Sequence, residues 1–489
     1  MSGATAFMII AFVYWLFLIG VGIYGFKTTK KSEDFFIAGG GLGFFVLSLS
    51  LLATYNSSIA LMGHTGNVYG SGLSYLTYLG GAPIAISVLI PIFYKRVWLI
   101  NRGNKYLTPA EMLGSYYKSD SIRGMIALIA LMMGVPYVAL QLIAAGTAFN
   151  ILSQGIISVS AGMYVMGGII VVYVVLGGLK SAAITNAIQG SLMTLALFLG
   201  AVYGLILVGG PMGLFNELGS LSKDMVMEGR VIPTSWQTNA TLLLSIAVGT
   251  VIGPLSLTWA LSAKSERIIH FSGIFSIVAQ VVMYILLIPT IGFTAMVLHP
   301  SISVTDEVLP TLISTGPSLL YALVGLGIFA AINSTADAYL HASGAMTGHD
   351  LYRVITKSTV ISPWVGRIAQ LFVVFIGLIF IAGSSESIVF LGALAGGLGM
   401  QTIPALIGAL FIPKYNKQGA LWGMIVGVIV TIITEFIVKH PLGVHSGLWG
   451  VLFNFLVISV LSIVIKTPNY SRNYDHFHGT LKEYYKKSA

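Results

Sequence analysis

The sequence predicts an all-α protein that crosses a lipid bilayer thirteen times, and its hydropathy, composition and charge distribution all indicate this fold class. Thirteen long apolar stretches follow one another along the 489 residues, and about 20 apolar residues are enough for a helix to span the hydrocarbon core. Hydrophobic residues make up 56% of the chain and charged residues only 8%, whereas soluble domains carry about 25% charged residues. We therefore expect a polytopic membrane protein.

The apolar stretches alternate with short connections, so the predicted spans can be placed in order along the chain. They lie near residues 4–26, 42–69, 72–95, 124–150, 158–177, 181–209, 240–262, 268–299, 318–347, 363–382, 386–412, 418–438 and 446–466. The longest polar stretches are 210–239, 300–317 and the tail 467–489. None of them is long enough to bury a core of its own, so residues 1–489 form one predicted transmembrane domain.

The positive charges predict how the chain is oriented in the membrane. Of the 25 Lys and Arg residues, 22 fall in connections on one side, and only Lys223, Arg230 and Lys439 fall on the other. Cytoplasmic connections collect Lys and Arg, so we expect a cell-membrane protein with its N-terminus outside and its C-terminus in the cytoplasm. The same bias accounts for the net charge of +9, and we expect no nucleic-acid partner.

Enzyme chemistry has little support in this sequence. The absence of Cys excludes disulfides, thiolate catalysis and Cys-ligated metals. The chain also lacks a P-loop lysine, an HExxH motif and a clustered acidic pair. Polar residues inside the predicted spans are instead the functional candidates, because an unpaired polar group in hydrocarbon is costly.

The second predicted span contains a run of five polar residues near its middle. They are Thr54, Tyr55, Asn56, Ser57 and Ser58. Successive residues of a helix are rotated by about 100°, so these five side chains cannot share one face. Either protein encloses the helix on all sides, with hydroxyls bonded to the preceding turn, or the helix is interrupted here and its free carbonyls and amides line a cavity.

The ninth predicted span contains the second polar cluster. Ser334, Asp337 and His341 lie within an arc of about 60° on a helix, and Thr335 lies beside them. Asp337 is either a structural partner, most simply of His341 one turn away, or a site for a cation or proton. A paired structural carboxylate in lipid gains little over an apolar residue, so the pattern favours the cation or proton site.

Stretches along nearly the whole chain are similar to one known family. They are SEDFFIAGGGLG at 32–43, LATYNSSIALMGHTGNVYGSGLSY at 52–75, GGLKSAAITNAIQG at 177–190, DEVLPTL at 306–312 and AAINSTADAYLHASGAMTGHDLYR at 330–353. In their order and spacing they resemble the sodium:solute symporter family, whose members take up sugars, proline, pantothenate, sialic acid and monocarboxylates. This resemblance implies a leucine-transporter-like fold, in which a single chain is able to transport.

The implied fold contains two inverted five-helix repeats. The resemblance places repeat 1 at 42–209 and repeat 2 at 240–412, with one extra helix at 4–26 and two at 418–466. In this architecture the first helix of each repeat is broken at mid-membrane, and substrate and sodium bind at the breaks. The polar run at 54–58 fits the first break, and Gly253-Pro254 fits the second because proline disrupts helical hydrogen bonding.

The resemblance also implies a sodium site between the two polar clusters. Its ligands would be the main-chain carbonyls of Ala53, Asn56 and Ala331 and the hydroxyls of Ser334 and Thr335. A hard cation prefers oxygen ligands, and neutral ligands hold it loosely enough for release. Na⁺ is therefore the expected coupling ion.

One departure from the family pattern concerns a second cation. Members with a second sodium carry an Asp in a T-D-x-x-Q context, whereas this chain has Asn186 in the run TNAIQ at 185–189. The position at which those members have an extra serine on the facing helix is Asp337 in this chain. The carboxylate thus lies on the facing helix, at Asp337, and not at position 186. This arrangement predicts a second cation or a proton at Asp337 and Asn186. Coupling by protons instead of sodium is the alternative.

The expected solute site is formed by polar residues at the two breaks and on neighbouring helices. The candidates are Thr54, Tyr55, Ser57, Ser58, Gln141, Trp259, Gln401 and Thr402. The run MGVPYVALQL at 133–142 is similar to the monocarboxylate branch, and LLATY at 51–55 to the pantothenate branch. We expect a monocarboxylate or a similar small carboxylate as the solute. The alternatives are proline or pantothenate, and a solute sensor or uniporter on the same fold.

Overall fold

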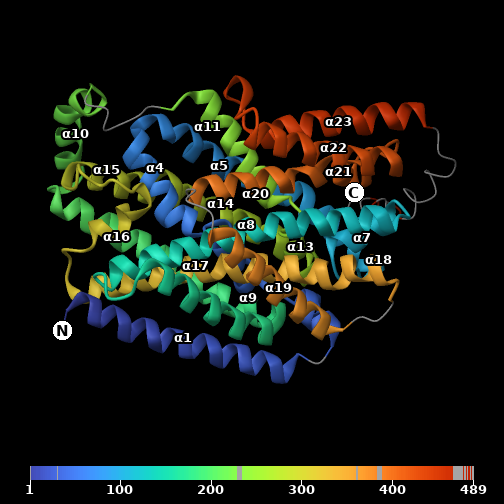
Figure 1. Ribbon diagram of the computed structural model, residues 1–489, viewed down its shortest axis with the longest axis horizontal. Coiled ribbons are helices and arrows are strands. Elements are labelled where there is room, and N and C mark those ends of the chain that lie inside the picture. Colours follow the sequence, from blue (N-terminus) through green and yellow to red (C-terminus); the bar gives the residue numbers. More distant parts are fainter. Residues whose placement is uncertain are drawn as a thin grey trace.

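The computed structural model is a bundle of helices packed side by side, shown in Figure 1. It describes residues 2–29, 31–227, 234–358, 362–382 and 388–465, together with six separate residues between 477 and 486. Most of the predicted cytoplasmic tail, and Arg230, lie outside the described residues.

The helices follow one another with short connections. They are α1 (Gly3–Thr28), α2 (Ser32–Ile37), α3 (Phe44–Tyr55), α4 (His64–Ser71), α5 (Leu76–Leu89), α6 (Lys95–Asn104), α7 (Pro109–Tyr116), α8 (Asp120–Leu152), α9 (Val159–Leu207), α10 (Gly210–Met227), α11 (Trp236–Leu243), α12 (Gly249–Val251), α13 (Leu257–Ser262), α14 (Glu266–Val281), α15 (Ile288–Leu298), α16 (Val308–Leu312), α17 (Ser318–Met346), α18 (Tyr352–Thr356), α19 (Pro363–Ala382), α20 (Ile388–Gly399), α21 (Ile403–Leu410), α22 (Lys417–Phe436) and α23 (Ser446–Val464). Short 3₁₀ or π-helical turns join several neighbours, including Ile59–Gly63 before α4, Ile90–Tyr94 before α6, Leu244–Val248 before α12 and Thr347–Leu351 after α17.

Ten helical stretches in the described part of the chain are long and apolar enough to cross a membrane. The structure is therefore an all-helical, multi-pass membrane protein, as the sequence predicted. The count of thirteen spans stays a prediction, because some predicted spans are interrupted and others are joined. The stretch Val159–Leu207, for example, covers nearly all of the fifth and sixth predicted spans.

The joint within α9 lies at Gly178. This residue has φ +68°, inside the left-handed region that residues with a side chain rarely adopt. A Cβ atom there would lie 2.7 Å from the ring of Phe35, so both the backbone and the close approach of α2 require glycine. The chain consequently turns back between the two spans without leaving a long loop.

Both predicted interruptions are confirmed. Helix α3 ends at Tyr55, and Asn56 has non-helical dihedral angles of φ −111° and ψ 76° before a helical turn resumes at Ile59. The second interruption separates α12 from α13 and contains Gly253 and Pro254.

Helix α17 lies at the centre of the bundle, packed against α8, α9, α1 and α19. Nearly all of its residues from Tyr321 onward are buried. In contrast, α1, α19 and α23 expose large apolar side chains such as Phe12, Phe375 and Leu456, as expected of faces that meet lipid. In Figure 1, α1 runs along one side of the bundle and α22 and α23 lie together on the opposite side. The polar residues of α17 are thus held inside protein.

Candidate functional site

Four of the five predicted sodium ligands meet between α3 and α17. The Ser334 hydroxyl donates to the carbonyl oxygen of Ala53 over 3.2 Å, and the Thr335 hydroxyl reaches the same oxygen over 3.3 Å. Ser334 Oγ also lies 3.0 Å from the carbonyl oxygen of Ala331. All four residues are fully buried. The group consists of neutral oxygen atoms, which are ligands suited to a hard cation such as Na⁺.

The end of α3 explains why these oxygens are available. The last four carbonyls of a helix have no partner within the helix, and here Leu52 and Ala53 are among them. The Asn56 backbone and side-chain amides both donate to the Leu52 carbonyl, over 3.1 and 2.8 Å. The Ala53 carbonyl is left to the hydroxyls of α17. Asn56, the fifth predicted ligand, follows the helix directly, with its side chain turned back to Leu52.

Asp337 lies one turn beyond Ser334 on α17 and is fully buried. Its carboxylate accepts hydrogen bonds from the hydroxyls of Tyr173 and Thr185, the second over 3.4 Å. These two residues lie on opposite sides of the Gly178 kink in α9. The carboxylate therefore faces α9, the helix on which the sequence placed the missing acidic residue.

Asn186 is fully buried, and neither atom of its amide has a hydrogen-bond partner. It follows Thr185, which contacts Asp337, and precedes Gly190 by one turn. A Cβ atom at Gly190 would lie 3.3 Å from the Cβ atom of Ala53, so this face of α9 packs on α3. The unpaired amide thus lies on α9 close to both candidate cation sites.

His341 makes contacts other than the expected one with Asp337. Its Nδ1 lies 3.1 Å from the side-chain amide of Gln370 on α19, and its Nε2 lies 3.4 Å from the Phe36 carbonyl oxygen. Among the described residues, no hydrogen bond or ion pair joins His341 to Asp337. The structure therefore gives no support to a structural Asp337–His341 pair.

A small cavity lies at the first interruption. Three predicted solute residues, Thr54, Tyr55 and Ser57, line it. Most of the remaining wall is aromatic or apolar and includes His64, Tyr78, Tyr137, Ile246, Thr250 and Tyr284. The volume of about 20 Å³ gives room for about one water molecule. The cavity is too small for an organic solute.

Two further predicted solute residues are sequence neighbours of cavity-lining residues, and their polar side-chain atoms have no hydrogen-bond partner. Gln141 is fully buried, and neither atom of its amide has a hydrogen-bond partner. It lies one turn after Tyr137, on the same face of α8 as that cavity residue. Ser58 follows the cavity residue Ser57, and its buried hydroxyl is also unpaired.

The other three predicted solute residues do not line the cavity. The side-chain amide of Gln401 donates to the Gly397 and Gly447 carbonyls over 2.8 and 3.1 Å, so it faces α23. The Thr402 hydroxyl donates to the Gly399 carbonyl over 2.9 Å, within its own chain segment. Trp259 is buried on α13, just beyond the second interruption.

Tyr94 connects the two interruptions and was not predicted from the sequence. Its hydroxyl lies 2.5 Å from the hydroxyl of Tyr55, and 2.9 and 3.0 Å from the carbonyl oxygens of Val251 and Ser256. Tyr55 ends α3, and the two carbonyls lie on either side of the second interruption. Tyrosine also occurs often at lipid boundaries, so sequence alone did not single out this residue.

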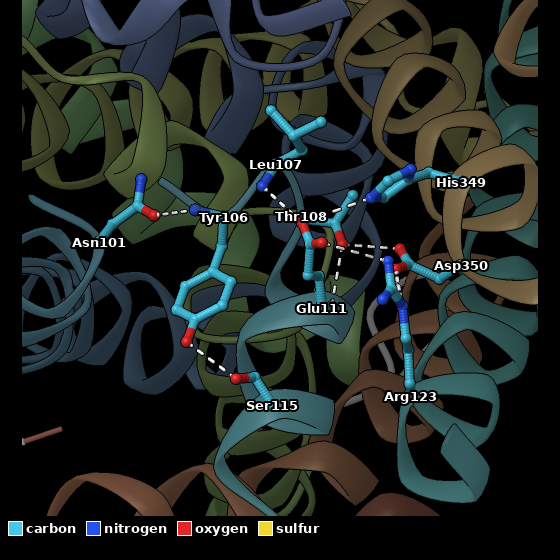
Figure 2. Close-up of polar contacts among 9 residues, drawn as sticks. All are labelled: Asn101, Tyr106, Leu107, Thr108, Glu111, Ser115, Arg123, His349 and Asp350. Carbon is cyan, nitrogen blue, oxygen red and sulfur yellow. Dashed lines mark hydrogen bonds and ion pairs between the residues drawn. The ribbon is translucent and has the colours of Figure 1, made fainter. Parts of the chain in front are cut away.

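A cluster of charged residues fixes one end of α17 and is drawn in Figure 2. We call it the Arg123 cluster; it consists of Thr108, Glu111, Arg123, His349 and Asp350. Arg123 Nε lies 2.6 Å from Asp350 Oδ1, and the Thr108 hydroxyl donates to Asp350 Oδ2 over 2.6 Å.

Glu111 joins α7 to the rest of the Arg123 cluster. One carboxylate oxygen lies 3.5 Å from the Arg123 guanidinium and the other 3.3 Å from His349 Nε2. Burial alone would raise the pKa of Glu111, but its contacts with His349, the backbone amide of Leu107 and the Arg123 guanidinium hold that pKa below its ordinary value. The cluster thus ties α7 and the start of α8 to the segment that follows α17.

The fold and the site define a class of protein. A multi-pass helical protein with two interrupted helices, and with neutral oxygen atoms gathered at one interruption, has the architecture of a secondary transporter. The sequence profile of the Sodium:solute symporter family matches residues 35–427. The chain belongs to this family, so its coupling ion is Na⁺.

Individual proteins agree with this assignment. A sodium/pantothenate symporter of Haemophilus influenzae is 23% identical over 462 residues, covering 91% of each chain. The sodium/proline symporter of Escherichia coli is 24% identical over 481 residues, covering 94% of each chain. A solved structure of a Na⁺-coupled sialic acid symporter in a substrate-bound outward-open state superposes with a TM-score of 0.79 at 19% identity, covering 94% of this chain and 98% of that one. This likeness confirms the leucine-transporter-like fold.

Proposed function

We propose that this symporter imports a small organic carboxylate together with Na⁺ by alternating access, and that it catalyses no reaction. The Na⁺ ion is held by the carbonyls of Ala53, Asn56 and Ala331 and the hydroxyls of Ser334 and Thr335. One observation supports this site above the others: two hydroxyls on α17 turn to a single carbonyl at the broken end of α3. In the absence of an ion, a hydroxyl hydrogen can point at that oxygen, and an ion would take the place of this contact.

The chemistry of the cavity supports a small carboxylate as the solute. Its walls supply hydroxyl groups from Thr54, Tyr55 and Ser57, and because no Lys or Arg is among the described lining residues, a carboxylate would be bound by hydroxyls and main-chain amides. After the break the chain resumes as a helix, and the amides at a helix start favour an anion. A monocarboxylate fits this chemistry. The relatives that transport proline and pantothenate support those two carboxylates as the main alternatives.

The arrangement in the membrane belongs to the same proposal. Residues 42–209 and 240–412 form two inverted repeats, flanked by helices at 4–26 and 418–466. The N-terminus lies outside the cell and the tail 467–489 in the cytoplasm, as the distribution of Lys and Arg indicates. A single chain contains all the proposed ligands, so transport requires no second copy.

Transport into proteoliposomes tests the solute and the coupling ion together. Purified protein would be offered radiolabelled lactate, pyruvate, proline and pantothenate, with a sodium gradient, a proton gradient or neither. We expect concentrative uptake of at least one carboxylate with the sodium gradient alone. Equal uptake with and without sodium would contradict the coupling and would favour a uniporter or, if the proton gradient drives uptake, a proton symporter.

We further propose that Asp337, with Asn186 beside it, holds a second cation or a proton. A membrane potential of 100 mV supplies about 2.3 kcal/mol for each charge that moves, and a tenfold sodium gradient adds about 1.4 kcal/mol. When the solute is a monoanion, its charge cancels the electrical contribution of the first Na⁺. A second cation bound at the buried Asp337 carboxylate restores that electrical contribution to uptake.

The Asp337→Asn variant should therefore move one positive charge fewer per solute. The reversal potential of transport in proteoliposomes measures this ratio independently of how much protein is active. The double variant Asp337→Asn/Asn186→Asp returns a carboxylate to α9 and should restore the wild-type ratio. An unchanged ratio in active Asp337→Asn protein would show that the carboxylate binds no transported cation.

Replacing Gln141 by leucine should weaken solute binding and leave sodium binding nearly unchanged. The unpaired amide of Gln141 lies on the cavity side of α8, and a lost hydrogen bond to a charged solute costs about 1.5–3 kcal/mol, or roughly tenfold to a hundredfold in affinity. Kinetics at varied solute and varied sodium concentration separate the two effects.

Gln401→Leu is the matched control for Gln141→Leu. The side-chain amide of Gln401 donates hydrogen bonds to the Gly397 and Gly447 carbonyls. Gln401→Leu should therefore lower thermal stability without changing the solute concentration for half-maximal uptake. Parallel losses of solute and sodium affinity in Gln141→Leu, or a larger loss of solute affinity in Gln401→Leu, would contradict the assignment of Gln141 to the cavity.

A further inference from the structure

The turn between α22 and α23 brings together a carboxylate and two imidazoles that are not part of the proposed transport site. Glu435 lies at the end of α22, and His440 and His445 lie on the turn. One possible ligand atom from each residue lies within 4.8 Å of the other two. His440 Nε2 is 3.1 Å from Glu435 Oε2, and the two imidazole rings have centroids 4.9 Å apart. In the part of the chain that the structure describes, this is the one such group of three residues.

The backbone of this turn holds the two histidines in place. Lys439, His440 and Leu442 all have φ between +55° and +59°, a left-handed conformation that is uncommon for residues with a side chain. The His440 amide donates to the Thr434 carbonyl over 2.9 Å, and the Trp449 indole donates to the Pro441 carbonyl over 3.2 Å. This sharp fold directs His440 back to the end of α22.

Two buried atoms of the group have no hydrogen-bond partner. They are Glu435 Oε1 and His445 Nδ1, and their residues are only 5% and 7% exposed. The other carboxylate oxygen of Glu435 accepts a hydrogen bond from Ser446, which orients the group. The side chain of His440 is 40% exposed, so an ion can enter from water.

We propose that Glu435, His440 and His445 form a binding site for a divalent transition-metal ion, with Zn²⁺ the best match. Two imidazoles and one carboxylate are an established ligand set for Zn²⁺, and water occupies the fourth position of such sites. Around a tetrahedral Zn²⁺ the ligand atoms stand about 3.3 Å apart. The three atoms already lie within 4.8 Å of one another, so the residues must close in only slightly to bind an ion.

The location of the site gives a bound ion a way to act on transport. The His445 amide donates to the Thr241 hydroxyl on α11 over 3.3 Å, and the turn lies beside α11 in Figure 1. Helix α11 leads through Leu244–Val248 to the cavity residue Thr250. An ion that holds the turn rigid therefore restrains one of the two interrupted helices. On the predicted orientation, the turn faces the outside of the cell.

Metal binding can be measured on the purified full chain in detergent, with no transport assay. Isothermal titration with Zn²⁺, and the visible absorption of bound Co²⁺, should show one ion bound per chain at micromolar concentration or below. His440→Ala removes an exposed side chain, so the fold is retained, and the affinity should fall at least tenfold. Glu435→Gln should have a similar effect. His270→Ala, which removes an exposed histidine on α14, should bind as the wild type does.

Two results would overturn the metal site. The first is an adventitious ion only, seen as equal binding by the wild type and His440→Ala. The second is the absence of saturable Zn²⁺ binding with a dissociation constant below about 100 μM.

Zn²⁺ added outside proteoliposomes should also slow uptake by the wild type at least twofold and leave His440→Ala unaffected. Equal inhibition of both proteins would refute an effect through this turn. The binding measurement succeeds or fails independently of the proposed solute.

Discussion

Uptake by the double variant Ser334→Ala/Thr335→Ala should lose its stimulation by sodium. Both hydroxyls reach the Ala53 carbonyl oxygen in the structure, and each is a proposed ligand of the ion. A hydrogen bond or contact to a charged group contributes about 1.5–3 kcal/mol, so each single variant should require at least about tenfold more sodium for half-maximal uptake. Without either hydroxyl, the site keeps carbonyl ligands alone. Initial uptake rates at varied sodium concentration in proteoliposomes measure the effect.

Ser343→Ala is the matched control for this experiment. Ser343 is a buried serine on the same helix, but its hydroxyl bonds to the Tyr339 carbonyl of its own helix over 2.7 Å. The control should retain the wild-type sodium dependence. If the double variant retained it too, the proposed sodium site would be in the wrong place, even though the family assignment would stand.

Arg123→Ala should be the most destabilising of the substitutions considered. Its guanidinium lies 2.6 Å from Asp350, whose side chain is 0% exposed. Removal of one partner of a buried ion pair costs about 3–5 kcal/mol, because the remaining charge is buried without compensation. The variant should show a much lower thermal unfolding temperature in detergent and a lower yield from the membrane.

A second variant distinguishes the buried charge from the loss of arginine packing. Arg123→Ala/Asp350→Asn removes the buried Asp350 carboxylate that Arg123→Ala leaves without its partner. The amide oxygen of the substituted side chain can still accept the hydrogen bond from Thr108, so the double variant should be more stable than Arg123→Ala. Arg267→Ala, which removes an exposed arginine on α14, should change the free energy of unfolding by less than about 0.5 kcal/mol. A double variant less stable than Arg123→Ala would contradict the electrostatic explanation.

Features of the site that follow from local sequence or from the family pattern could be predicted. Features that depend on tertiary packing could not. The polar run at 54–58 and the Gly-Pro step predicted both interruptions, because few polar residues occur in a span without such a reason. Ser334 and Thr335 adjoin the end of α3 as the resemblance implied. These features follow from local chemistry together with a known family pattern.

Asp337 and Gln401 show where sequence reasoning reached its limit. Helical spacing places His341 one turn from Asp337, but that spacing cannot tell which neighbouring helix each side chain meets. The structure joins Asp337 to α9 and His341 to α19. Gln401 lies on a segment that is buried on all sides, so no apolar stripe in its sequence could indicate which direction faces the cavity.

The hydroxyl of Tyr94 has a mechanical consequence for the transport cycle. It is shared between the end of α3, through Tyr55, and both sides of the second interruption, through Val251 and Ser256. A movement of either broken helix by itself must break contacts of this buried hydroxyl, and a lost hydrogen bond costs about 1 kcal/mol. We expect the two helices to move as one unit for this reason. If one half of a symporter moved without the other, ions could cross without solute, so we expect this hydroxyl to oppose uncoupled loss of the ion gradient.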